Sequence, residues 1–99
     1  MYLIIRRLKV QSHLWDEVLQ RMENGYVPIL KNNSEFVEFY GVIVGDEGVS
    51  ISVFETQQAA EEANRQALEW AKENLAPLLQ APVEIVAAGE VRIYKRAAE

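Results

Sequence analysis

Four stretches of the chain have the patterns of β-strands: three follow a period of two residues, and the second carries apolar residues on both faces. These stretches span residues 2–10, 36–44, 49–54 and, with an interruption, 83–93. The four residues 45–48 predict a tight hairpin between the second and third strands. In the last stretch the alternation breaks at residues 87–89 and resumes at Val91 and Ile93, which predicts a bulge or a bend.

A helix with a narrow apolar stripe follows the third strand. Thr56 can offer its side-chain oxygen to the free amides of a helix start, so we expect it to be the N-cap, and the pattern fades at Asn74. The stripe consists of Ala60, Ala63, Ala67, Trp70, Ala71 and Leu75. Asn64 lies inside this apolar arc, where an unpaired amide would cost about 1–3 kcal/mol. Two interpretations of Asn64 are open: it bonds the backbone of a neighbouring strand, or it lines a pocket.

The segment between the first two strands predicts a first helix that is kinked or in two pieces. Ser12 can cap a helix that begins near His13. Asn24-Gly25 is typical of a helix end, yet apolar residues continue at helical spacing beyond it. Pro28 stands where the first turn of a new helix tolerates proline.

The predicted order is β-α-β-β-α-β, which indicates the α+β ferredoxin-like fold: a four-stranded antiparallel sheet with both helices on one face. We expect residues 1–99 to form a single domain of this kind. Several apolar side chains fall on the uncovered face of the sheet, namely Leu3, Ile5, Tyr40, Val42 and Val44. Because a monomer rarely exposes such a patch, the sequence predicts a partner there, a second copy of the chain.

Composition and charge narrow the classes of function. The 99 residues carry a formal net charge of −5, which disfavours binding to nucleic acids and to anionic membrane surfaces. The chain has no cysteine, no signal-peptide pattern and no apolar run of membrane-spanning length, so we expect a soluble cytoplasmic protein. Its glycines fit hairpin geometry rather than a phosphate-binding loop, and no acids show ligand spacing, so we expect no cofactor and no metal.

Several stretches resemble a known family. They are FVEFYGVIV, the hairpin after it, VSISVFET, the alanine-rich EEANRQALEW and NLAPLL. Together they cover almost the whole chain and resemble the antibiotic biosynthesis monooxygenase-like (ABM) domains of the dimeric α/β barrel superfamily, in particular its small uncharacterised members. The resemblance implies a homodimer in which two ferredoxin-like subunits place their sheets face to face as a barrel.

The resemblance also implies a range of activities. Members include cofactor-free oxygenases of aromatic or quinol-like substrates, haem-degrading enzymes, and small lyases or isomerases. The haem-degrading members resemble one another in an Asn on strand one and a His on helix two, and this chain has neither. The oxygenases use Asn, Trp, Tyr and Arg around the pocket, and the matching residue types here are Asn64, Trp70, Tyr40 and Arg92.

Two further residues, Trp15 and His13, are candidates on their own chemistry. Trp15 and Trp70, one on each helix, either flank an aromatic ligand or fill the core. His13 is the only histidine, so it is either the general base of an enzyme or a solvated residue at a helix start.

Two classes of function follow from these observations. The first is a small cofactor-free enzyme, oxygenase-like or lyase-like, that acts on an apolar ring between sheet and helices. The second is a non-catalytic dimeric module that binds a small ligand or only assembles. A pocket that contains Asn64 and a second polar partner favours the enzyme, and a filled core favours the module.

Overall fold

A computed structural model describes residues 1–98 of the chain, and its elements follow the predicted order. The strands are β1 (Tyr2–Lys9), β2 (Phe36–Val44), β3 (Glu47–Phe54) and β4 (Glu84–Glu90). The helices are α1 (Trp15–Arg21), α2 (Val27–Lys31) and α3 (Gln57–Asn74), with short 3₁₀ turns at Ser12–Leu14 and Ala76–Leu78. None of the helices in residues 1–98 has both the length and the apolar content needed to cross a membrane.

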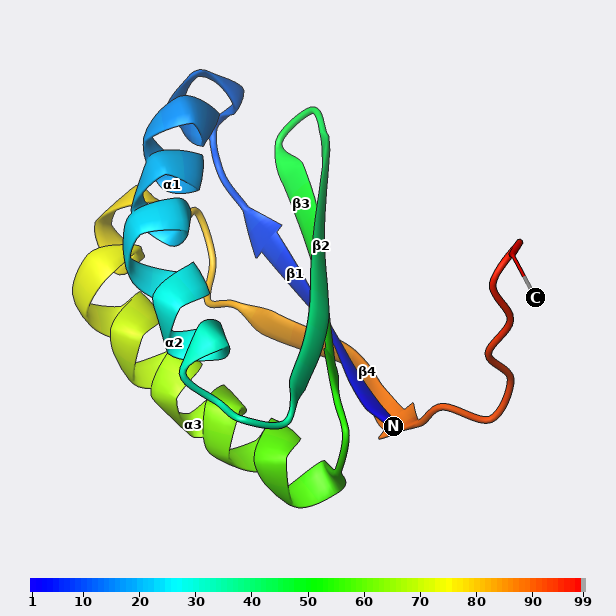
Figure 1. The fold of residues 1–99 in the computed structure, drawn as a ribbon. Coiled ribbons are helices and arrows are strands. Elements are labelled where there is room, and N and C mark those ends of the chain that lie inside the picture. Colours follow the sequence, from blue (N-terminus) through cyan, green and yellow to red (C-terminus); the bar gives the residue numbers. More distant parts are fainter. Residues whose placement is uncertain (99) are drawn as a thin grey trace.

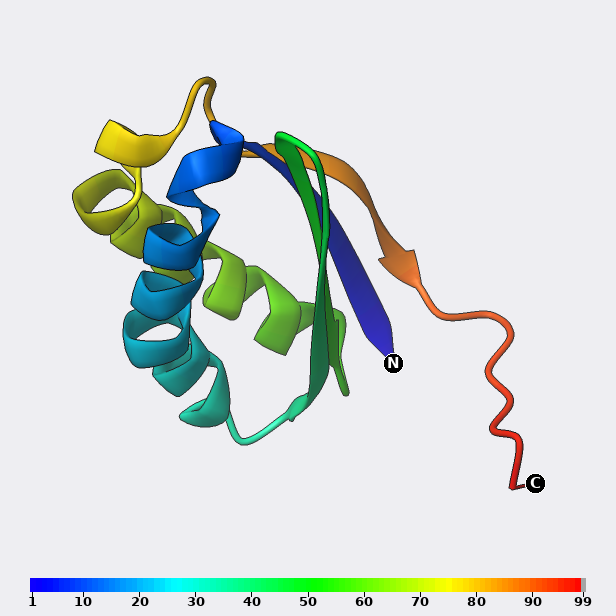
Figure 2. The same cartoon turned by 90° about the horizontal axis from the view of Figure 1, so that it is seen from above.

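The sheet has the strand order β2-β3-β1-β4, and every neighbouring pair is antiparallel. All three α-helices lie on one face of this sheet, as Figures 1 and 2 show from two directions. The two-residue loop of the β2–β3 hairpin is made possible by Gly45, whose φ of 64° is open mainly to glycine. The ferredoxin-like α+β fold predicted from the sequence is therefore confirmed.

The first helix is in two α-helical pieces, as predicted, but the positions predicted for its cap and its end were wrong. Ser12 is not a cap: it is the first residue of a 3₁₀ turn that has no side-chain cap bond. Asn24-Gly25 does not end the helix, because a π-helical turn (Met22–Tyr26) carries the chain from α1 directly into α2. Thr56 does cap α3, since its hydroxyl accepts a hydrogen bond from the amide of Ala59 at 3.2 Å.

The last strand is shorter than its alternation suggests. The irregularity lies at Val86, because Ile5 pairs with Ala87 while the next residue of β1, Arg6, pairs with Ile85. The amide of Val91 bonds the carbonyl of Met1 at 2.9 Å, and beyond that point the described chain leaves the sheet. Residues 91–98 run away from the sheet on the side opposite the helices (Figure 2). The predicted resumption of the strand at Val91 and Ile93 is wrong because no strand in residues 1–98 lies alongside to pair with it.

The glycine in the π-helical turn is required by packing, which yields a first prediction. Alanine is normally favoured over glycine in a helix by about 1 kcal/mol. A Cβ at Gly25, however, would lie 2.5 Å from the indole Nε1 of Trp70. We therefore expect Gly25→Ala to lower the free energy of unfolding by about 1–3 kcal/mol, measured by urea denaturation.

Gly41→Ala is the matched control for this prediction. Its added Cβ would meet Phe39 at 4.0 Å, an ordinary contact. We expect its stability to change by less than about 1 kcal/mol. A Gly25→Ala variant as stable as the parent would contradict the packing of Trp70 against this turn.

Candidate functional site

The side of the sheet that faces the helices is unusually polar in its centre. On β3 this side carries Ser50 and Ser52, which are buried, whereas Val49 and Ile51 lie on the opposite side. On β1 it carries Arg6, which is only 5 % exposed between the buried Ile4 and Leu8. Arg6 pairs with Ser50 in the β1–β3 register, so the small serine side chains leave room for the long guanidinium group.

Arg6 is held by neutral partners from three other elements. Its Nη1 donates to the hydroxyls of Tyr26 and Ser52, both at 3.4 Å. Its Nη2 donates a short hydrogen bond to Oδ1 of Asn64 on α3. The Nε of Arg6 is buried and has no partner in the part of the chain that the structure describes. We call Arg6, Tyr26, Ser52 and Asn64 the buried polar cluster.

The cluster holds a positive charge without a counter-ion. Burial lowers the pKa of the Arg6 guanidinium, and the electrostatic interaction with Tyr26 acts in the opposite direction. Arginine nevertheless stays protonated at neutral pH because its ordinary pKa is far above 7. A buried cation normally pairs with a carboxylate, and none is among the hydrogen-bond partners of Arg6 in residues 1–98.

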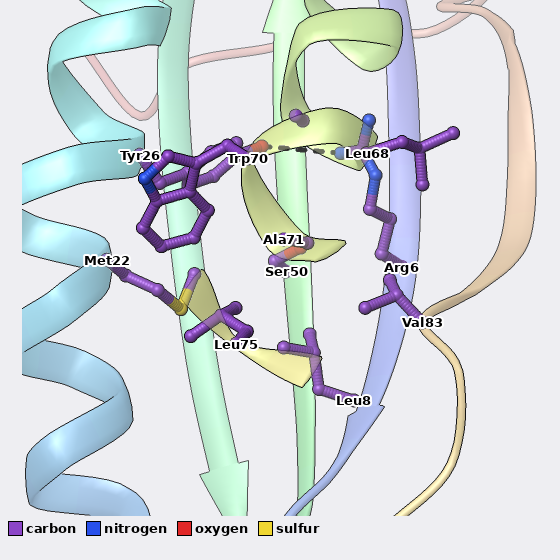
Figure 3. Close-up of a pocket in the computed structure, with 11 residues that line it drawn as sticks. Arg6, Leu8, Met22, Tyr26, Ser50, Leu68, Trp70, Ala71, Leu75 and Val83 are labelled. Carbon is purple, nitrogen blue, oxygen red and sulfur yellow. Dashed lines mark hydrogen bonds between the residues drawn. The ribbon is translucent and has the colours of Figure 1, made fainter. Parts of the chain in front are cut away.

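A cavity of about 30 Å³ lies beside this cation, between β1 and α3. Figure 3 shows Arg6 reaching toward the Tyr26 hydroxyl, with the Trp70 indole close to the Tyr26 side chain. The rings of Tyr26 and Trp70 are 5.8 Å apart and inclined by 32°. The remaining walls are mostly apolar: Leu8, Met22, Ala67, Leu68, Ala71, Leu75 and Val83, with Ser50. The space holds a water molecule or a small anionic group but not an aromatic ring.

A larger groove of about 440 Å³ lies next to the cavity, along the end of α3 and the segment that leads into β4. Leu68, Ala71 and Val83 border both the cavity and the groove. The groove is lined otherwise by Lys72, Ala76, Leu79, Gln80, Ala81 and Pro82. Leu68 is 38 % exposed, so its side chain can move without breaking a packed core. The inner cavity and the outer groove are thus separated by only a few side chains.

The structure brings together two of the six residues singled out from the sequence. Asn64 belongs to the buried polar cluster, and Trp70 lines the cavity beside it. Asn64 bonds the side chain of Arg6 rather than a strand's backbone, so its partner was not the one that the simpler interpretation expected.

The other four candidates lie elsewhere. Trp15 is buried in a second apolar cluster with Leu8 and Val18, and its Nε1 donates to the carbonyl of Gly45 at 2.8 Å. His13 and Arg92 are exposed and line neither the cavity nor the groove.

Tyr40 is exposed on the uncovered face of the sheet. Its hydroxyl donates to Glu38 at 2.5 Å, and this bond raises the pKa of Tyr40. A raised pKa keeps the phenol protonated, so Tyr40 is not poised to act as a base.

Sequence reasoning missed Arg6, Tyr26 and Ser52. The available signal was the position of Arg6 in the alternation of β1, where it shares a face with Ile4 and Leu8. A charged residue on the apolar side of a strand is a candidate for function because its burial is costly.

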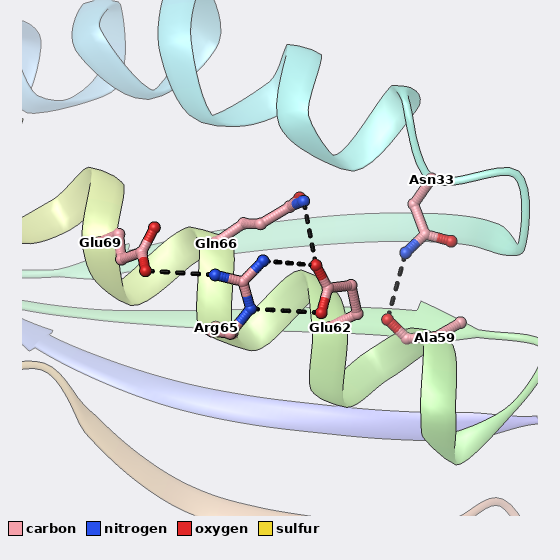
Figure 4. Close-up of polar contacts among 6 residues, drawn as sticks. All are labelled: Asn33, Ala59, Glu62, Arg65, Gln66 and Glu69. Atoms are coloured by element: carbon pink, nitrogen blue, oxygen red, sulfur yellow. Dashed lines mark hydrogen bonds and ion pairs between the residues drawn. The ribbon is translucent and has the colours of Figure 1, made fainter.

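The outer surface of α3 has a different character. Figure 4 shows Arg65 bridging Glu62 and Glu69, with bonds of 2.6 and 3.2 Å, and Asn33 donating to the carbonyl of Ala59. The hydrogen bond from Arg65 lowers the pKa of Glu62. Each of these three charges has a partner and contact with solvent, which is typical of a solvated helix face rather than a binding site.

Comparison with known proteins supports the fold and leaves the activity open. No protein-family model matches the sequence, and no curated protein matches it. A protein of unknown function from Nitrosomonas europaea is similar in structure, with a TM-score of 0.73 at 18 % identity over 99 % of this chain and 95 % of that one.

Two similar structures are oxygenases. The ActVA-Orf6 monooxygenase of Streptomyces coelicolor, in complex with nanaomycin D, has a TM-score of 0.73 at 16 % identity over 96 % of this chain and 92 % of that one. An asparagine-to-alanine variant of SnoaB, a cofactor-independent oxygenase from Streptomyces nogalater, has a TM-score of 0.69 at 17 % identity over 94 % of each chain. The predicted resemblance to antibiotic biosynthesis monooxygenase-like proteins is therefore confirmed for the fold.

Proposed function

We infer that this protein is a cofactor-independent oxygenase of a small aromatic or quinol-like substrate, which binds between β1 and α3. The observation that carries this inference is the contact between Arg6 and Asn64 beside the Trp70-lined cavity. A buried cation with an unpaired N–H is costly in a core that serves stability alone. The same arrangement is useful where negative charge develops on a bound molecule.

The chemistry assigned to the site is stabilisation of a substrate anion. No histidine or carboxylate lines the cavity in residues 1–98, so no side chain there is suited to remove a proton at neutral pH. The substrate therefore binds as an anion, and Arg6, which Asn64 holds in place, stabilises its charge. The apolar walls keep the ring in place and exclude water.

The reaction needs no other electron donor. The electron-rich ring carbon of the anion attacks O₂, and a hydroperoxide forms after protonation. Loss of water from this hydroperoxide turns the ring carbon that attacked O₂ into a carbonyl. One oxygen atom enters the product and the other leaves as water, and all four electrons come from the substrate.

Isotope labelling tests this proposal. The protein is incubated with a panel of dihydroxy-aromatic compounds under ¹⁸O₂, and the products are analysed by mass spectrometry. We expect protein-dependent oxygen uptake and one ¹⁸O atom per oxygenated product. Uptake no faster than in the absence of protein, across the panel, would refute the oxygenase assignment.

The uncovered sheet face supports a second part of the proposal, a homodimer. This face, which we call the open face, presents apolar residues from three strands: Leu3, Ile5, Tyr40, Val42, Val44, Val49 and Ile51. Tyr40, Val42 and Val44 are 53 %, 55 % and 74 % exposed. A second copy that packs the same face against it would bury this surface and form the closed barrel that the resemblance implies.

The alternative is a non-catalytic dimeric module that binds a small ligand or only assembles. The observation in its favour is the size of the cavity, since about 30 Å³ does not admit a ring unless side chains move. Native mass spectrometry distinguishes the two functions. A retained small molecule that neither consumes oxygen nor changes in mass would favour the binding module.

A further inference from the structure

The charges that line the inner cavity and the outer groove are all positive. Arg6 lines the cavity and Lys72 lines the groove, and no carboxylate of residues 1–98 lines either one. This contrasts with the net charge of −5 of the whole chain. A local excess of positive charge on an acidic protein favours an anionic ligand over a cationic one.

We propose that the ligand of this site is an aromatic monoanion, whose single charged group displaces solvent beside Arg6 while its ring occupies the groove between Leu68 and Val83. The inference rests on the proposed function for the position of the site but not for any reaction with oxygen. Arg6 supplies the charge and an Nε–H that lacks an acceptor. Asn64 and Tyr26 orient the guanidinium group by the bonds described above.

The sizes of the cavity and the groove determine which part of the ligand lies in each. The inner cavity, at about 30 Å³, accepts a carboxylate or a phenolate oxygen, and the groove, at about 440 Å³, accepts the ring. Leu68 and Val83 line the cavity together with Arg6, and Figure 3 shows Leu68 near the guanidinium end of the Arg6 side chain. A ligand that enters from the groove must therefore pass Leu68 before its charge reaches Arg6.

A pair of probes that differ only in charge tests the proposal. Gentisate is an aromatic carboxylate, and gentisamide is its neutral amide of nearly the same shape. Both are titrated into the protein of residues 1–99 by calorimetry under nitrogen, so that no oxidation occurs. We expect gentisate to bind about 10- to 100-fold more tightly than gentisamide, because hydrogen bonds to a charged group are the stronger ones. Equal affinities, or no binding of either probe at millimolar concentration, would overturn the proposal.

Three variants test whether the preference for gentisate arises at Arg6. Arg6→Gln should remove the preference for gentisate, and Arg65→Gln, the matched loss of an exposed arginine on α3, should preserve it. Leu68→Ala should raise the association rate of gentisate in stopped-flow measurements of tryptophan fluorescence. If a folded Arg6→Gln variant still binds gentisate more tightly than gentisamide, the anion binds at another site. If that variant does not fold, the comparison of the two probes on the parent protein still decides the proposal.

The experiment separates this inference from the oxygenase assignment. Tight anaerobic binding of gentisate with no oxygen uptake across the panel would support the anion site and refute the oxygenase. Oxygen uptake with no difference between the two probes would support oxygenase activity but refute both the anion site and the role proposed for Arg6 in the reaction.

Discussion

An Ile51→Lys variant is expected to be a folded monomer in solutions where the parent protein is a dimer. Ile51 lies on β3, pairs with Ile5 of β1, and is at the centre of the open face. A dimer through this face would bury one unpaired ammonium group from each copy, at a cost of several kcal/mol. We expect the dissociation constant of the dimer to rise at least about a hundredfold, measured by light scattering at low micromolar concentration.

Leu19→Lys is the matched control for the dimer. Leu19 is also an exposed apolar residue, at 44 %, but it lies on α1 on the other side of the sheet. Its replacement should leave the mass in solution unchanged. A well-folded parent monomer whose open face binds no hydrophobic dye would contradict both the dimer and the barrel.

An Asn64→Ala variant is expected to lose stability because it leaves the Arg6 Nη2 without its acceptor. A hydrogen bond to a buried charge contributes about 1.5–3 kcal/mol, while alanine regains about 0.6 kcal/mol of helix propensity. We therefore expect the free energy of unfolding to fall by about 1–2 kcal/mol in thermal or urea denaturation. Gln66→Ala, an amide replacement on the exposed side of α3, should change it by less than about 0.5 kcal/mol.

Replacing both partners should reverse this loss. The double variant Arg6→Met with Asn64→Leu removes the buried charge and its N–H donors, and the hydroxyls of Tyr26 and Ser52 remain partners of each other at 3.4 Å. We expect it to be at least as stable as the parent, since apolar replacements of buried ion or hydrogen-bond pairs are often neutral or stabilising. A double variant less stable than Asn64→Ala would show that the Arg6–Asn64 pair serves the stability of the fold, and it would remove the main argument for a functional site.

Much of the fold could be predicted because its signals are local. Thr56 stands directly before the helix that it caps, and the run of residues 36–44, which is apolar on both faces, marks β2 with its observed bounds. Predictions about features that depend on residues far away in the sequence were wrong. Asn24-Gly25 is a common helix end, but the continuation through it depends on Trp70, which packs against Gly25 from another helix.

The site was harder to predict than the fold for the same reason. Asn64 could be noticed because a polar residue interrupts the apolar side of its own helix. Its partner Arg6 is 58 residues away, and a strand arginine commonly points to solvent. Arg6 can be buried because the small serines of β3 lie on the same side of the sheet. That they share this side follows from the pairing of the strands, which the sequence alone does not show. Tyr26 likewise reaches the cluster only because the helix continues through residues 22–26.

The central claim of this account is that Arg6 and Asn64 serve a bound molecule rather than the stability of the fold. The most direct test is oxygen uptake by the parent and by the Arg6→Met, Asn64→Leu double variant, with the same dihydroxy-aromatic substrate and equal concentrations of folded protein. The account predicts uptake by the parent and none above background by the stable double variant. Equal uptake by the two proteins would contradict it.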